Sequence, residues 1–358
     1  MQPPRGTAPS TPVAVVMPVR NGEAYLADAL DSIFRQSFGD FILFAIDDGS
    51  TDATPAILRS ISDPRLRRLN NRGKGLVDAL LTGLAESDSP LIARMDADDV
   101  ALPDRFARQM AYLTARPEIS LVGTQVAHID AAGVATGTVS NLPTGSDEIA
   151  RALPARGCVL RHPTIMMRRG MLESATYRRV AEGAEDYDLW LRLSEVHALA
   201  NLPDVLLHYR IHGAQVSAGI NWRQRFAHDL ALLSARARRR GAPDPLDVFD
   251  ATIPYADPAT RTDARLDPAL RNLVIAYAAA EKLDDASAAP PDAQSLHAMI
   301  ETTRHALFGD GRRTRARMMA RAARAALRQG RWSLALQSIR LAFEAAPGRA
   351  VGDMLADR

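Results

Sequence analysis

The sequence predicts an α/β fold with a mostly parallel sheet and helices on both faces. Four times in the first 116 residues, a short apolar run ends in polar residues and a helical pattern follows. This alternation is typical of βαβ units, which build parallel sheets. The carboxyl ends of such strands meet at one edge, where ligands bind in open α/β folds. The predicted strands are residues 13–19, 41–46, 66–69 and 91–95.

The segments between these strands favour helices. Apolar residues recur at helical spacing over residues 26–34, after the first strand. Ser50 and Asp52 are potential helix caps after the second strand. The pattern predicts further helices over residues 76–86 and 104–116, the last of them opened by a proline.

Beyond residue 118 the alternation gives way to a mixed α+β pattern, and then to helices alone. We predict strands over residues 119–129, 163–168 and 205–211 and a helix over residues 185–195. The chain is thus expected to contain a flexible tail, an α/β domain in two halves and a helical extension. These are residues 1–11, 12–220 (halves 12–116 and 117–220) and 221–358.

Charge and cysteine content exclude several classes of protein. A formal net charge of +2 over 358 residues gives no overall basic field, so no nucleic-acid partner is expected. The single cysteine, Cys158, excludes an internal disulfide framework and indicates a reducing compartment, hence the cytoplasm. No run approaches the roughly 18 to 20 consecutive apolar residues that cross a bilayer.

Three carboxylates follow the fourth predicted strand within four residues, at Asp96, Asp98 and Asp99. A divalent cation relieves their repulsion, and hard oxygen ligands suit Mg²⁺ or Mn²⁺. Because Mg²⁺ is typically held by one or two carboxylates and substrate phosphates, a diphosphate would complete the shell. The alternative is an aspartate-rich turn that only caps a helix. Val100 and a missing glycine exclude an EF-hand loop.

The tip of the second predicted strand carries Asp48. A carboxylate there can accept hydrogen bonds from the imide of uracil or thymine, or from a ribose hydroxyl. Aspartate and serine before a helix also serve as ordinary caps. Because parallel strands bring their tips to one edge, we expect Asn21, Asp48 and Asp98 to line one crevice.

A later acidic pair, Glu185 and Asp186, opens the helix predicted over residues 185–195. The helix dipole favours carboxylates at that end, so the pair has a purely structural interpretation. Alternatively, one carboxylate is a general base that takes the proton of an acceptor hydroxyl. His162, Arg210 and His212 are, with Glu185, candidate contacts to an acceptor or a diphosphate; metal ligation by the histidines is not favoured.

Taken together, these segments resemble the family 2 glycosyltransferases, which have the GT-A fold. The resemblance covers roughly residues 12 to 220, and the joint order of its segments makes it specific. The three principal segments are MPVRNGEAYLADALDSIFRQSFGDF, IDDGSTDAT and ARMDADDVALPDRFARQM. The likeness continues through RHPTIMMRRGML, AEDYDLWLRL and LHYRIHGAQVS.

The resemblance implies roles for individual residues. Asp48 would bind the base of the donor, and Asp96 and Asp98 would bind the ribose and the metal–diphosphate. Pro18 and Asn21 are grouped with them as donor-binding residues. The segment that follows Asn71 departs from the family pattern, so no sugar contact is implied there.

The same resemblance makes Asp186 the catalytic base of an inverting displacement. The implied donor is a nucleotide-diphosphate sugar of the UDP or dTDP type, and the implied acceptor is a saccharide or a lipid-linked molecule. Bacterial surface-polysaccharide or glycoconjugate assembly is the implied setting. The Q-x-x-R-W signature of processive synthases is absent, which favours addition of a single sugar.

Two other functions are consistent with parts of the pattern. A sugar-nucleotide pyrophosphorylase would carry a glycine-rich, basic loop after its first strand, and residues 17–23 are not such a loop. A catalytically inactive nucleotide-sugar-binding module would keep the crevice without turnover, although three retained acidic sites argue against it. A scaffold built on the helical extension would leave the aspartates unexplained.

The last helices carry a dense arginine face. Such a face is either simply solvated or holds the protein against anionic lipid at the inner face of a membrane, at about 1 kcal/mol per basic residue. Peripheral membrane contact through this extension is therefore a further expectation. The arginines are Arg312, Arg313, Arg315, Arg317, Arg321, Arg324, Arg328 and Arg331.

Overall fold

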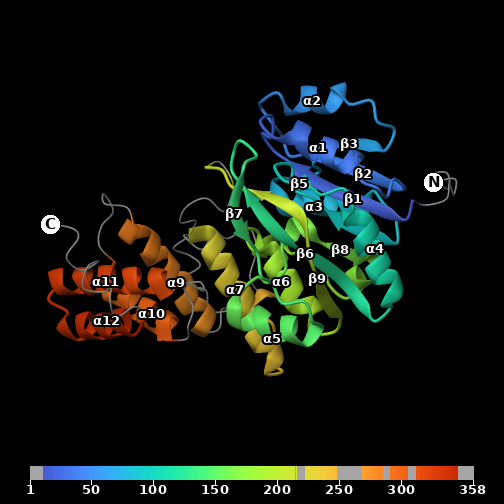
Figure 1. Ribbon diagram of the computed structural model, residues 1–358. Helices are drawn as coiled ribbons and strands as arrows, with labels where there is room; N and C mark the ends of the chain where they lie inside the picture. The colour runs from blue at the N-terminus through green and yellow to red at the C-terminus, as the bar shows by residue number, and fades with distance from the viewer. Residues whose placement is uncertain are drawn as a thin grey trace, which may run out of the picture. The chain divides into compact units, whose positions relative to one another are not determined.

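The chain divides into two units in a computed structural model (Figure 1). One unit comprises Met1–Arg179 with Leu189–Ala218, and the other comprises Val180–Asp188 with Gly219–Arg358. The segment Val180–Asp188 thus groups with the C-terminal residues, whereas the sequence pattern assigned it to the α/β domain. The structure describes residues 11–213, 215, 222–247, 268–284, 291–304 and 312–345.

The described part of the first unit is built on one sheet of nine strands. These are β1 (Val13–Val19), β2 (Phe41–Asp47), β3 (Leu66–Asn70), β4 (Leu91–Arg94), β5 (Val100–Ala101), β6 (Ile119–Ile129), β7 (Ala135–Val139), β8 (Met166–Arg168) and β9 (Ala198–Arg210). Their order is β3-β2-β1-β4-β8-β6-β9-β5, with β7 beside β6. Strands β3, β2, β1 and β4 are parallel, as the sequence predicts.

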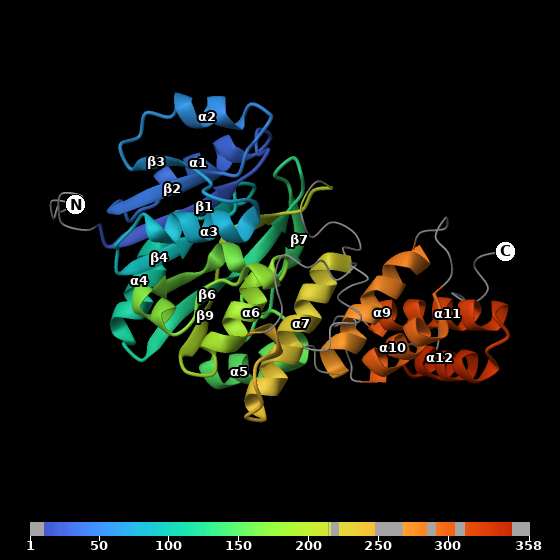
Figure 2. The ribbon, with the colours of Figure 1, turned by 180° about the vertical axis from the view of Figure 1, so that it is seen from behind.

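Helices cover both faces of the parallel strands (Figure 2). Val15 of β1 joins Leu30 and Phe106 in the core on one face. The adjacent Val16 points to the opposite face, because successive strand side chains alternate. There, a Cβ added to Gly83 would lie 2.7 Å from Val16 Cγ1, so glycine lets its helix approach the sheet. The helices are α1 (Leu26–Phe34), α2 (Thr54–Ser60), α3 (Gly75–Ala85), α4 (Arg105–Ala115) and α5 (Ser146–Arg156).

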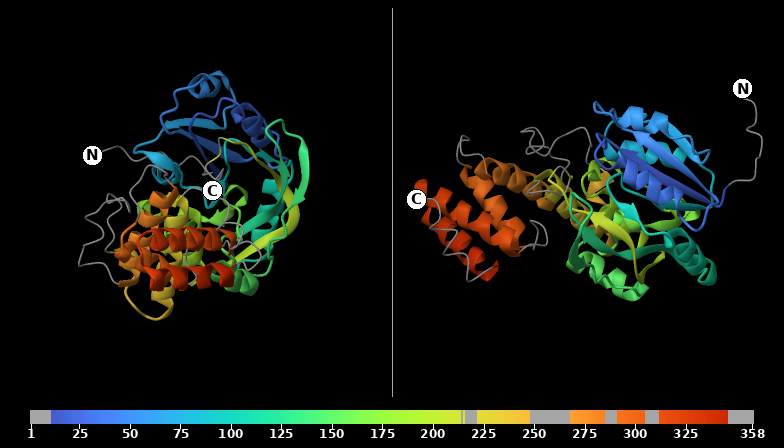
Figure 3. Two further views of the ribbon diagram at one scale, coloured as in Figure 1. Left: turned by 90° about the vertical axis from the view of Figure 1, so that its left-hand side faces the viewer. Right: turned by 45° about the horizontal axis from the view of Figure 1, so that its top comes forward.

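The second half of the sheet is mixed, as expected beyond residue 118. Strand β8 runs antiparallel to both β4 and β6, whereas the long strands β6 and β9 are parallel to each other. Strands β6 and β9 curve strongly, and register shifts interrupt their pairing (Figure 3). The short strand β5 pairs antiparallel with β9. This pairing places the loop between β4 and β5 beside the end of β9.

The α/β class with a helical C-terminal region is confirmed, but several local features differ from the prediction. Strand β9 begins at Ala198, seven residues before the predicted start at residue 205. The strand predicted over residues 163–168 is wrong in its first half, because His162–Thr164 forms a 3₁₀ turn and only Met166–Arg168 pairs. Pro163 has no N–H to donate to a strand partner, which favours the turn. Helix α5 and strand β5 were not predicted.

The described part of the second unit is helical. Besides α6 (Glu185–Leu193), which begins in this unit, it contains five helices: α7 (Trp222–Arg239), α9 (Pro268–Asp284), α10 (Ala293–Arg304), α11 (Arg312–Arg328) and α12 (Trp332–Ala345). Apolar residues such as Leu230, Tyr277 and Met299 are fully buried among them. Within the described ranges, no helix is both long and apolar enough to cross a membrane.

Candidate active site

Three loops meet at the carboxyl edge of the parallel strands, following β1, β2 and β4. Strand β1 lies between the other two, so the loops are neighbours although they are far apart in sequence. A Cβ on Gly22 would lie 3.9 Å from the methyl group of Ala97, which joins the first loop to the third. The loops that carry the predicted site residues Asn21, Asp48 and Asp98 therefore lie side by side at this edge.

Hydrogen bonds hold the loops after β1 and β2 together. The backbone N–H of Asn21 donates to Ser50 Oγ at 2.9 Å, and Thr51 N–H donates to Asn21 Oδ1 at 2.8 Å. Gly22 N–H donates to Thr54 Oγ1 at 2.8 Å. Asn21 adopts a left-handed backbone conformation (φ 50°), which asparagine tolerates better than most residues. Asn21 thus joins the loops after β1 and β2, and its predicted donor contact stays a prediction.

Asp48 lies at the end of β2, and its half-buried carboxylate receives hydrogen bonds from the next loop. Asn71 Nδ2 donates to Asp48 Oδ1 at 2.6 Å, and Gly75 N–H lies 3.1 Å from both carboxylate oxygens. A carboxylate has about four acceptor positions, so capacity remains for a ligand. Pro18, the other predicted donor-binding residue of this region, is buried within β1 opposite Ile46.

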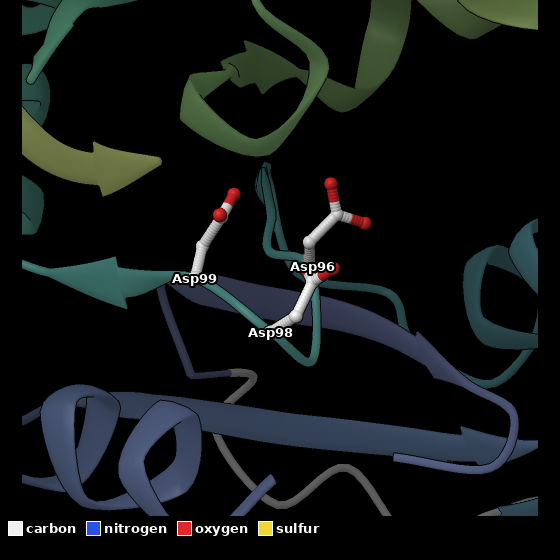
Figure 4. A group of neighbouring side chains, drawn as sticks. All are labelled: Asp96, Asp98 and Asp99. Carbon is white, nitrogen blue, oxygen red and sulfur yellow. The ribbon is translucent and has the colours of Figure 1, made fainter. Parts of the chain in front are cut away.

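The loop between β4 and β5 carries the aspartate cluster (Figure 4). One oxygen from each of Asp96, Asp98 and Asp99 lies within 4.8 Å of the others. Asp99 is buried, and its Oδ2 has no hydrogen-bond partner among the described residues. Burial, together with the charges of Asp96 and Asp98, raises the pKa of the Asp99 carboxyl well above its ordinary value. Burial and the neighbouring carboxylates therefore disfavour the ionised form of Asp99.

Two buried arginines lie beneath this loop. Arg94 pairs with Asp96, and although burial opposes its charge, this carboxylate raises the pKa of Arg94. Arg105 is fully buried, and its guanidinium donates to the carbonyl of Arg94 at 2.6 Å. Burial lowers the pKa of Arg105 to about 9, so it stays charged at neutral pH. Neither arginine was singled out from the sequence.

Residues at and just after the end of β9 contact the aspartate cluster. His212 Nε2 lies 3.0 Å from Asp98 Oδ2. The backbone N–H of Arg210 donates to Asp99 Oδ1 at 2.8 Å, and its Nε donates to the Asp98 carbonyl at 2.8 Å. Tyr25 contacts both side chains, with the guanidinium 4.6 Å and the imidazole 4.7 Å from its ring centroid. Arg210 is buried and orders this loop; its predicted diphosphate contact stays a prediction.

His162 lies in the core of the first unit. It is 7% exposed, its Nε2 lies 2.8 Å from Tyr177 Oη, and its ring packs edge-on against Trp190. Burial, and then the charge of Arg94, hold the pKa of His162 well below its ordinary value. The neutral imidazole is therefore suited to its buried position beside Tyr177 and Trp190, and a contact to an acceptor or diphosphate stays a prediction.

The first turn of α6 belongs to the second unit, where Asp186 differs from its acidic neighbours. Glu185 is 5% exposed, and its carboxylate accepts a hydrogen bond from Gly183 N–H at 2.8 Å. Asp188 is 1% exposed. Asp186 is only half-buried, with Oδ1 accepting from Tyr187 N–H at 2.7 Å. Of these three side chains, that of Asp186 is the most exposed to solvent. The predicted acceptor contact of Glu185 is untested by this geometry.

Comparisons with known proteins agree with this arrangement. The family model described as "Glycosyl transferase family 2" matches residues 14–175. An uncharacterized glycosyltransferase of Haemophilus influenzae is 30% identical over 224 residues, which cover 59% of this chain and 69% of that protein. The O-antigen biosynthesis glycosyltransferase WbnJ of Escherichia coli is 31% identical over 210 residues, covering 56% and 80%.

Among solved structures, the chain resembles residues 1–349 of TarS from S. aureus, crystallised in complex with UDP-GlcNAc. The TM-score is 0.56 at 14% identity, and the likeness covers 94% of this chain and 92% of the TarS chain. At this sequence identity the similarity shows the fold alone, and it confirms the GT-A architecture. The matched sequence family and its relatives supply the function: this chain is a glycosyltransferase and belongs to family 2.

Proposed function

We propose that the enzyme moves one sugar from a nucleotide-diphosphate donor to an acceptor hydroxyl, with Mn²⁺ or Mg²⁺ and with inversion at the anomeric carbon. The observation that carries this proposal is the cluster of Asp96, Asp98 and Asp99, whose oxygens lie within 4.8 Å of one another at the carboxyl edge of the sheet. That edge is where open α/β sheets bind ligands.

The donor set of this cluster fits a hard divalent cation. Carboxylate oxygens are the ligands that Mg²⁺ and Mn²⁺ prefer, and the buried Oδ2 of Asp99 has no hydrogen-bond partner among the described residues. Arg94 already neutralises Asp96, so Asp98 is the principal candidate ligand and Asp96 a secondary one. A cation bound there would stabilise the negative charge that develops on the departing diphosphate.

The nucleoside is assigned to Asp48. Its carboxylate is positioned by Asn71 and Gly75 and retains acceptor capacity for the imide N–H of uracil or thymine. The UDP-GlcNAc complex of TarS supports a UDP-type donor, because the two chains share the fold that presents this edge. Asn21 and Pro18 are also assigned to donor binding. Asn21 would act through the loop after β1 that it orders.

Asp186 is assigned as the general base. A carboxylate that removes the acceptor proton makes the hydroxyl more nucleophilic as it attacks the anomeric carbon from the face opposite the diphosphate. One such base suffices for an inverting displacement. Its partial exposure at the start of α6 supports this choice over the buried Glu185 and Asp188.

The acceptor is assigned to the saccharide or lipid-linked class. The O-antigen biosynthesis role of WbnJ and the amylovoran biosynthesis role of AmsE from Erwinia amylovora, which is 29% identical over 201 residues, support surface-polysaccharide assembly. The single free cysteine supports a reducing, cytoplasmic compartment. Family membership favours this activity over a pyrophosphorylase, and the retained acidic sites argue against an inactive module.

A panel of nucleotide sugars tests the proposal. We expect one UDP- or dTDP-sugar to raise the Tm strongly in Mn²⁺ and much less in EDTA, since ligand binding to the folded state shifts unfolding by mass action. Stabilisation that is equal in EDTA would contradict metal-dependent binding. The stabilising donor is then incubated with candidate acceptors, and product stereochemistry at the anomeric carbon is read by NMR; retention would contradict inversion.

A further inference from the structure

The turn between α11 and α12 presents apolar side chains to solvent. Trp332, Leu336 and Leu327 are 68%, 65% and 38% exposed, which is unusual for such large apolar residues. Trp332 and Leu336 are four residues apart on α12 and so share one helix face. We refer to Leu327, Arg328, Arg331, Trp332 and Leu336 as the α11–α12 tip.

The backbone fixes the tip as a tight turn. Gly330 adopts a left-handed conformation (φ 68°) of the kind that ends helices. Arg331 N–H donates to the carbonyl of Ala326 at 2.9 Å, and Gly330 N–H donates to that of Leu327 at 3.0 Å. The apolar residues on either side of the turn therefore stay in a fixed arrangement.

The charge around the tip is strongly one-sided. Residues 312–345 contain nine arginines, no lysine and one carboxylate, Glu344. Arg328 and Arg331 are exposed at the turn itself. Arg340 is exposed one turn beyond Leu336, where it pairs with Glu344 at 2.8 Å. An apolar face with arginines at its border complements a surface that is apolar inside and anionic outside.

We propose that the α11–α12 tip docks this enzyme onto the surface of an anionic lipid bilayer. Trp332 and Leu336 enter the boundary between headgroups and acyl chains, where tryptophan is favoured, and Arg328 and Arg331 pair with headgroup phosphates. The tip is narrower than the arginine face that the sequence suggested. Arg321 and Arg324 of that face are half-buried, whereas the two exposed apolar residues of α12 were not part of it.

Flotation of the full chain with vesicles tests the proposal. We expect binding to vesicles rich in phosphatidylglycerol and little binding to pure phosphatidylcholine. Raising the salt from about 0.1 M to about 1 M shortens the screening length from about 10 Å to about 3 Å and should release most of the protein. Absence of binding to the anionic vesicles would overturn the proposal.

Two double variants separate the apolar and the charged contribution. Trp332→Ser with Leu336→Ser should weaken partitioning by about tenfold or more for each side chain. Arg328→Gln with Arg331→Gln should weaken it about fivefold for each arginine, the equivalent of about 1 kcal/mol. Because the four side chains are exposed, the variants should keep the helical circular dichroism of the parent protein.

Matched controls lie in the first unit. Val139→Ser with Val196→Ser removes apolar residues that are 56% and 68% exposed, and Arg35→Gln with Arg59→Gln removes two exposed charges. These variants should float like the parent protein. Equal flotation of tip and control variants would overturn the proposal. Light scattering that shows the parent to be a dimer and the tip variants to be monomers would instead assign the tip to a second copy of the chain.

Discussion

The imidazole of His212 contacts the carboxylate of Asp98 at hydrogen-bond distance, with 3.0 Å between Nε2 and Oδ2, although the two residues are 114 positions apart in the sequence. The contact exists because β9 pairs with β5, which directly follows the aspartate cluster. Tyr25 packs against the same imidazole from the start of α1. Residues from two distant segments, His212 after β9 and Tyr25 before α1, therefore act on the orientation of Asp98.

His212→Ala should weaken Mn²⁺ binding about 10- to 100-fold, which is the usual effect of removing a group that orients a metal ligand. Isothermal titration of Mn²⁺ in the presence of saturating UDP measures this affinity. His197→Ala is the control, because His197 bonds Ser120 and Ser174 instead of the cluster. If both variants bind Mn²⁺ like the parent, His212 does not support the site.

The parallel half of the fold was predictable because three of its strands, β1, β2 and β4, are mostly buried. The run Val13–Val19 is apolar throughout and matches β1 residue for residue, and β6 also has its predicted bounds. The position of the loops of Asp48 and Asp98 at one edge of the sheet follows from topology alone, since parallel strands end at one edge. Helix α5 was not predicted, because its sequence contains a proline and few large apolar residues.

Contacts that depend on strand pairing could not be predicted from the sequence. The pairing of β5 with β9 brings His212 to Asp98, and no periodicity in either segment encodes that register. Arg94 fits the pattern of the predicted strand, and nothing in the sequence indicates that it is buried and pairs with Asp96. The exposure of Trp332 could not be predicted from the sequence either, because a large apolar residue in a helix is usually buried.

Asp98→Asn should remove the metal-dependent part of donor binding. The substitution keeps the size of the side chain and its contact to His212 but removes the charge that a divalent cation requires. Calorimetry of the donor with Mn²⁺ and with EDTA should give the same weak affinity in both. Asp147→Asn, an exposed carboxylate on α5, should leave the Mn²⁺ dependence intact. An unchanged response to Mn²⁺ in Asp98→Asn would remove this residue from the metal site.

Asp186→Asn should lower turnover by about 10²–10⁴ while donor affinity stays within twofold to threefold, roughly the scatter of such measurements. The amide cannot take a proton from the acceptor, but it preserves the size of the side chain. Glu182→Gln, four residues earlier, is the matched control and should keep parental turnover. Full activity in Asp186→Asn would assign the base to another group, and a parallel loss of donor affinity would indicate a structural role.

His162 should make the folded protein less stable below neutral pH. Its ordinary pKa is 6.5, and burial, followed by the charge of Arg94, holds the folded value well below this. As the pH falls below 6.5, the unfolded chain binds a proton that the folded protein does not. The free energy of unfolding should therefore decrease, by up to about 1.4 kcal/mol per pH unit from this group, until the folded pKa is reached.

Urea unfolding at a series of pH values in EDTA isolates this contribution. His162→Gln should flatten the decline below pH 6.5, because glutamine does not titrate. Tyr177→Phe removes the hydroxyl that lies 2.8 Å from His162 Nε2 but keeps the imidazole. It should lower the free energy of unfolding at every pH by about 1 kcal/mol while the acid decline persists. If the decline is equally steep in His162→Gln, the buried imidazole is not its source.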